Sequence, residues 1–221
     1  MNTLKLLAGT IAALSVAGAA SASTTLYSNP ILLPANGDCS FSTTCAADFG
    51  RGDDFAAQEF TVSNASVIVS ADFIELDHGT TPTAVTWAFI AADGAGGLPG
   101  TILATGTDAL TATADGTSNG YNLSRMSFVV GTVALAPGTY YLALQAISPI
   151  QGTYLGQGVA ASGAAETMDG GATWAFGYET IPSVAVDVFV PEPATWALML
   201  AGFTGVGFGL RTARRTRTAA A

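Results

Sequence analysis

The sequence predicts an all-β domain, an antiparallel sandwich or barrel, with a hydrophobic segment at each end of the chain. Several short segments alternate apolar and polar residues with a period of two, which is the pattern of half-buried strands. Clusters of Gly, Pro, Asn and Asp separate these segments, and outside the two ends no segment has the period of a helix. Short strands at this spacing are typical of sandwiches and barrels.

The composition of the 221 residues excludes several classes of protein. The chain is 49% hydrophobic, which excludes an ordinary disordered polypeptide. Its seven basic residues are too few for a nucleic-acid surface, so no nucleic-acid partner is expected. A single His and two neighbouring Cys leave no room for a His/Cys metal cluster or for a Cys–His catalytic pair built from separate segments.

Residues 1–22 are identified as a secretory signal peptide. Lys5 gives a short positive start, Leu6–Val16 an apolar stretch, and Ala20 and Ala22 the small residues of an A-x-A cleavage site. We expect signal peptidase to cut after Ala22 and the rest of the chain to be exported.

Residues 23–190 form the expected β domain, which is long enough for one sizeable core. They carry 15 acidic and 2 basic residues, a net charge of −13, because five of the seven basic residues of the chain lie at its ends. This charge repels nucleic acid and anionic lipid and favours solubility.

Two cysteines, Cys39 and Cys45, lie near the start of this domain. Export places them in an oxidising compartment, where a local pair most simply forms a disulfide. A metal site there would need further ligands, and none is close in the sequence.

Six segments carry the strand alternation. They are Ala57–Ser63, Ser66–Leu76, Ala84–Ala92, Met126–Val130, Thr139–Ile147 and Ser183–Val188. On the second segment Val67, Val69, Ala71 and Phe73 share one face, and on the third Trp87 alternates into the core. Turn clusters separate the segments at Asp93–Gly100, Asp115–Gly120, Pro137–Gly138 and Asp169–Gly171.

Within about residues 50–190 the domain resembles the jelly-roll β-sandwich modules of bacterial surface proteins. The resemblance is carried by Gln58–Val62, Ala88–Asp93, Gly97–Gly100, Leu103–Gly106 and Leu135–Leu142. It implies a jelly-roll-like antiparallel sandwich of the kind often joined to anchoring tails. A shared fold does not imply a shared activity.

No catalytic motif stands out, and no enzymatic activity is expected. The chain has no G-x-S-x-G elbow, and His78, beside Asp77, fits an exposed turn. A glycosidase would need two carboxyl groups about 5–9 Å apart, which local sequence does not specify.

Two binding hypotheses remain open beside their plainer alternatives. The first concerns four aspartates that are weak candidates for Ca²⁺ ligands or, alternatively, solvated turn residues: Asp48, Asp53, Asp54 and Asp115. We therefore expect no cofactor other than calcium. Trp174 and Tyr178 follow a glycine turn and are candidates for stacking on sugar rings or for packing.

The C-terminal hydrophobic segment, Ala194–Leu210, predicts one transmembrane helix. Its 17 uncharged residues correspond to roughly 25 Å of helix, the short end of spanning length. Arginines follow it at once, and they should hold that end in the cytoplasm and the β domain outside. They are Arg211, Arg214, Arg215 and Arg217.

The last 30 residues or so resemble a PEP-CTERM sorting signal, close to the PEPxxWA variant. The three parts of that signal are present in order: Pro191-Glu192-Pro193 with Trp196, the hydrophobic segment 194–210, and the arginine-rich tail 211–217. Thr and Ala interrupt the arginines, which departs from a compact cluster. The resemblance implies recognition through these motif residues and arginines by exosortase, a membrane enzyme with a cysteine nucleophile, in a Gram-negative bacterium that makes exopolysaccharide.

The sequence therefore favours a non-enzymatic exported protein. It would anchor transiently in the inner membrane and then reach the cell surface or the exopolysaccharide (biofilm) matrix, with exosortase, signal peptidase and exopolysaccharide as partners. The alternative is a secreted carbohydrate-binding or carbohydrate-active β-sandwich.

Overall fold

The structure is a computed structural model, and it describes residues 23–32, 55–77, 81–118, 120–147, 154–160, 162–176 and 183–191. All of them belong to one compact unit, Ser23–Pro193. The expected signal peptide, the cysteines Cys39 and Cys45, and the expected transmembrane segment lie outside the described residues. Among the described residues no helix has the length and apolar character that crossing a membrane requires.

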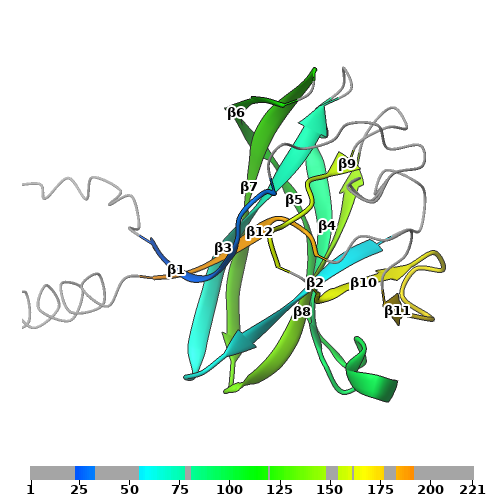
Figure 1. Cartoon of the computed structure of the whole chain (residues 1–221). Helices are drawn as coiled ribbons and strands as arrows, with labels where there is room; N and C mark the ends of the chain where they lie inside the picture. Colours follow the sequence, from blue (N-terminus) through cyan, green and yellow to red (C-terminus); the bar gives the residue numbers. More distant parts are fainter. Residues whose placement is uncertain are drawn as a thin grey trace, which may run out of the picture. The chain divides into compact units, whose positions relative to one another are not determined.

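Two antiparallel sheets form the domain, which confirms the predicted all-β sandwich (Figure 1). The first sheet has the order β1-β12-β3-β7-β6, with β9 beside β3, and the second has the order β11-β10-β2-β8-β4-β5. The strands are β1 (Ser23–Asn29), β2 (Phe55–Val62), β3 (Ser66–Asp77), β4 (Ala84–Ala91), β5 (Ile102–Ala109), β6 (Thr111–Ser118), β7 (Tyr121–Leu135), β8 (Gly138–Ile147), β9 (Tyr154–Leu155), β10 (Ala164–Thr167), β11 (Ala175–Phe176) and β12 (Val186–Pro191).

The main core lies between the sheets and is built from alternate residues of the strands. Phe60 of β2 lies at its centre, with ring centroids 5.9 to 6.0 Å from those of Tyr27, Phe89 and Tyr140. Along four strands the alternate apolar residues of the predicted segments face this core. These are Val85, Trp87 and Phe89 of β4, Met126, Phe128 and Val130 of β7, Tyr140, Leu142, Leu144 and Ala146 of β8, and Val186 and Val188 of β12.

The predicted face of β3 is wrong at its first half. Ile68 is fully buried in the core, whereas Val67 and Val69 are only partly buried. The cause is a β-bulge against β7 between Ile68 and Ser70, where β7 advances four residues (Val133 to Val129) while β3 advances two, and the alternation of β3 reverses there. Beyond the bulge Ala71 and Phe73 face the core as predicted.

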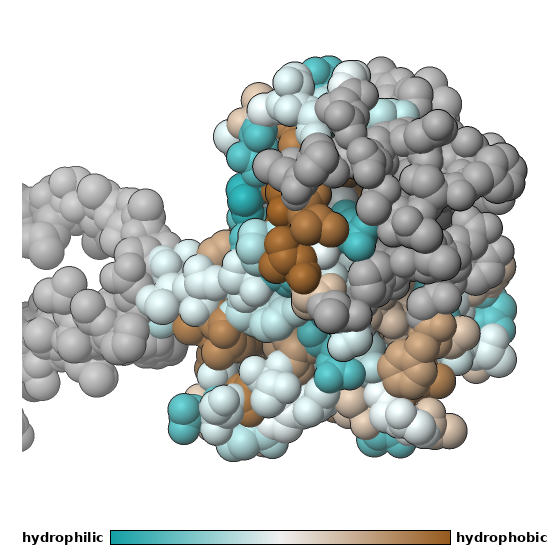
Figure 2. All heavy atoms as spheres, in the orientation of Figure 1, coloured by the Kyte–Doolittle hydropathy of each residue, from teal (hydrophilic) through white to brown (hydrophobic). Residues whose placement is uncertain are grey.

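Strands poor in large apolar residues were not predicted. β1, β5 and β6 are made mostly of Ser, Thr, Ala and Gly, and β6 is almost wholly exposed. The cluster Asp115–Gly120, expected to be a turn, is therefore mostly strand, with a bulge between Ala114 and Gly116. The paired strands β6 and β7 carry the polar upper left edge of the domain (Figure 2).

Two buried amides join the sheets around Val184. The Val184 N–H donates to Gln58 Oε1 of β2 at 2.7 Å, and its carbonyl accepts from Asn29 Nδ2 of β1 at 2.7 Å. Gln58 and Asn29 are 1% and 2% exposed. Because a buried backbone group must be paired, these amides fix the segment that leads into β12.

Candidate functional site

The strand β12 leads directly into the predicted sorting motif. Pro191, the first residue of that motif, is the last residue of β12. It pairs with Ser23, the first residue after the predicted signal cleavage. A proline without an N–H is tolerated at such a strand end. β12 lies between β1 and β3, so the two ends of the folded domain lie side by side (Figure 1).

A groove of about 450 Å³ opens on the outer face of the first sheet, close to this junction. Its volume lies within the range of small-molecule sites. The pairing register explains the lining: Phe189, Ser70 and Val129 form one row across β12, β3 and β7, and Asp72, Ser127 and Thr111 form the next. The remaining lining residues are Ser23, Asp108, Ala109 and Phe128.

Both carboxylates of the groove are held by neighbouring groups. Asp108 Oδ2 accepts a hydrogen bond from the buried indole of Trp87 at 2.7 Å. Asp72 Oδ2 lies 3.7 Å from Arg125 Nη1, and its side chain is 13% exposed. Burial raises the pKa of Asp72, against the lowering effects of the Ser127 hydrogen bond and the Arg125 charge. The lining therefore presents oriented oxygen acceptors.

Arg125 of β7 lies among three aspartates from three other strands. Its Nη1 donates to Asp187 of β12 at 2.8 Å, and its Nη2 lies 3.3 Å from Asp115 of β6. With Asp72 this makes a charge cluster across β12, β3, β7 and β6 on the outer face of the sheet. Its members are partly exposed, so each ion pair contributes little to the free energy of folding.

The calcium hypothesis receives no further support. Asp115 belongs to the Arg125 cluster, while Asp48, Asp53 and Asp54 lie outside the described residues. In the ranges that the structure describes, no three His, Cys, Asp or Glu side chains gather as they would around a metal ion. His78 also lies outside the described residues.

Trp174, one of the two predicted sugar-stacking residues, lies on the other sheet. It is half-buried against the outer face of the second sheet, in a cluster that includes Tyr141. The hydroxyl of Tyr141 lies 3.1 Å from Glu59 Oε2 and 3.0 Å from the Gly97 carbonyl, and burial raises the pKa of this tyrosine. Tyr178 lies outside the described residues, so the pair stays a prediction.

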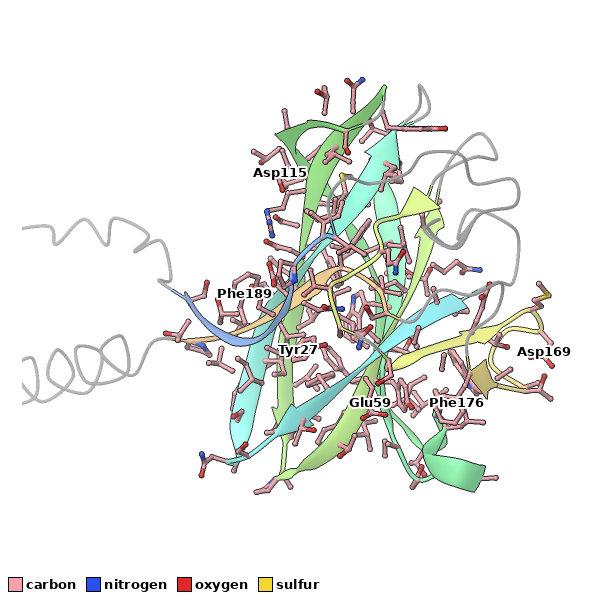
Figure 3. The ribbon with its side chains drawn as sticks, viewed as in Figure 1. Tyr27, Glu59, Asp115, Asp169, Phe176 and Phe189 are labelled. Atoms are coloured by element: carbon pink, nitrogen blue, oxygen red, sulfur yellow. The ribbon has the colours of Figure 1, made fainter. Side chains whose placement is uncertain are left out.

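The groove residues were missed by sequence reasoning. Phe189 is not among the residues predicted to bind sugar, although the alternation of β12 places it opposite the core face of Val188. Figure 3 shows Phe189 and Asp115 on the side of the first sheet, and Phe176 and Asp169 on the side of β10 and β11. The alternation that turns Phe189 outward is visible in β12 alone, but the residues that join Phe189 in the groove come from other strands.

These features define a class: an all-β sandwich whose last strand continues into a C-terminal sorting tail. Residues 189–215 match the PEP-CTERM protein-sorting motif, and this chain carries that motif. The match begins within β12 and includes Pro191, Glu192, Pro193, Trp196 and the first three arginines of the tail, while Arg217 lies beyond it. No curated protein matches the chain. The motif indicates an exported protein that is sorted by exosortase, a membrane enzyme.

Proposed function

We propose that this protein is a non-enzymatic component of the cell surface or of the extracellular, exopolysaccharide-containing matrix. Exosortase would process its tail after signal peptidase has removed its N-terminal segment. The observation that carries the proposal is the direct continuation of β12 into the sorting motif at Pro191. Because the motif follows β12 directly, processing at the motif would deliver the whole sandwich.

The surface of the domain supports this role. Its net charge of −13 and its polar edge along β6 suit a protein that stays soluble outside the cell. The pairing of Ser23 with Pro191 places the two ends of the folded domain beside each other.

The test is cell fractionation of a native host with its exosortase intact or deleted. We expect the protein in the medium or matrix of the intact strain and in the inner membrane of the deleted one. Glu192→Gln should behave like the deletion, while Glu166→Gln on β10 serves as the matched control and should be sorted normally. Normal delivery of the Glu192→Gln chain to the medium or matrix in the strain that lacks exosortase would refute the proposal.

A second candidate function is carbohydrate binding, favoured by the groove on the first sheet. Its hydroxyls, carboxylates and phenyl ring are the groups that recognise sugars. Release of reducing sugar from a bound polysaccharide by the purified chain would instead identify a carbohydrate-active enzyme.

A further inference from the structure

We infer that the groove on the outer face of the first sheet binds an uncharged polysaccharide, with Phe189 and Val129 contacting sugar rings and Asp72 and Asp108 accepting their hydroxyl hydrogens. This inference rests on the second candidate function and assigns the site and the ligand class to it. The apolar surface, the hydrogen-bonding groups and the charge of the groove each support it.

The apolar part is the row Phe189–Ser70–Val129. Val129 is 65% exposed, and among the described residues it is the most exposed large hydrophobic side chain. The register places Phe189 two strands away, about 10 Å across the sheet, with the small Ser70 between them. The result is a shallow floor with an apolar group at each side, and the C–H faces of sugar rings pack on such groups.

The hydrogen-bonding part is the neighbouring row and Asp108. Ser127 and Thr111 supply hydroxyls that both donate and accept, and the two carboxylates accept only. Trp87 fixes Asp108 and Ser127 holds Asp72, so neither carboxylate must be ordered when a ligand arrives. Preorganised acceptors lower the entropic cost of binding a polymer rich in hydroxyl groups.

The charge decides between polysaccharide classes. A domain with net charge −13 repels an anionic polymer. A cationic polymer would have to pair with these carboxylates, but Asp72 lies 3.7 Å from Arg125 with its side chain only 13% exposed, and one oxygen of Asp108 is already bound by the Trp87 indole, which leaves lone pairs for hydroxyl groups and poor access for a cation. An uncharged chain meets neither obstacle.

The experiment is affinity electrophoresis of the full chain in mild detergent, in native gels containing dextran, hydroxyethyl cellulose or alginate. We expect at least one of the two neutral polymers to slow the protein and alginate to have no effect. Raising the ionic strength from about 0.05 M to about 0.5 M should leave the retardation unchanged, since no charge pairing is involved.

Paired variants locate the binding. Phe189→Ala should weaken it about tenfold, the loss of one ring contact together with its buried area. Phe176→Ala, the same change at a ring 54% exposed on the second sheet, should not. Val129→Arg fills the groove from an exposed position and should abolish binding, whereas Val159→Arg, at 53% exposure, should retain it.

Failure of both neutral polymers to retard the wild-type chain overturns the inference, as does stronger retardation by alginate. Unchanged binding by folded Val129→Arg, with a melting temperature like that of Val159→Arg, places the ligand elsewhere and also overturns it. The purified chain is tested without exosortase, so a failure here leaves the sorting proposal standing, and a failure of sorting leaves this result standing.

Discussion

Asp169 shows how one side chain organises a loop of this protein. It lies between β10 and β11, where its carboxylate accepts hydrogen bonds from the Thr167 hydroxyl at 2.6 Å and from the Thr173 N–H and hydroxyl at 2.8 and 2.7 Å. These bonds favour the charged form. The Thr167 bond first, and then those from Thr173, lower the pKa of Asp169 from 3.8 to about 2.

The sign of the pH effect follows from that direction. A carboxyl whose pKa is lower in the folded state contributes stability above its ordinary pKa and loses it as the pH falls towards the folded value. We therefore expect the loop to loosen between about pH 4 and pH 2. An NMR titration of the Asp169 carboxyl checks this, and Thr173→Val should raise its pKa, whereas Thr113→Val on β6 should not. An unshifted wild-type titration near 3.8 would rule out the loop geometry.

The pairing of β4 with β5 brings a core residue of one strand into contact with a groove residue of the other. Trp87 lies opposite Gly106, and a Cβ at Gly106 would come within 2.7 Å of the Trp87 ring. The glycine therefore leaves room for the indole, whose N–H reaches Asp108 on the same strand as Gly106. A small residue in β5 thus determines where a groove carboxylate is held.

Gly106→Ala should lower the free energy of unfolding by about 1–3 kcal/mol, the usual cost of overpacking. The cost should shrink in a Trp87→Phe background, because the smaller ring leaves space for the methyl group, and the two changes should be coupled in a double-mutant cycle. Urea unfolding of the wild type, the two single variants and the double variant measures these costs. Equal costs in both backgrounds would mean that the indole does not restrict this position.

The elements that the sequence predicted best are those with two buried faces or one clearly apolar face. β8 is an example: Tyr140, Leu142 and Leu144 face the core, while Tyr141 and Ala143 are buried on the other side. The edge strands β5 and β6 were not predicted, because their Thr, Ala and Gly residues do not give one apolar and one polar face. Alternating threonines are nevertheless typical of strands. The bulge between β3 and β7 could not be predicted either, because no residue type in β3 marks the position where the pairing register shifts.

Of the two functional features of the whole molecule, one could be predicted from the sequence and the other could not. The sorting motif could be predicted because its parts are contiguous in the sequence, and the match at residues 189–215 confirms it. The groove could not, because Phe189, Asp72 and Val129 come from three strands that are distant in sequence and meet only through sheet pairing.

The proposed function depends on exosortase processing this chain at its C-terminal motif and so delivering the β-sandwich. The most direct measurement is the intact mass of the protein recovered from cells with and without exosortase. We expect a chain that begins at Ser23 in both strains, and that lacks the tail beyond the Pro191-Glu192-Pro193 motif only when exosortase is present. An intact tail, held in the inner membrane of both strains, would contradict it.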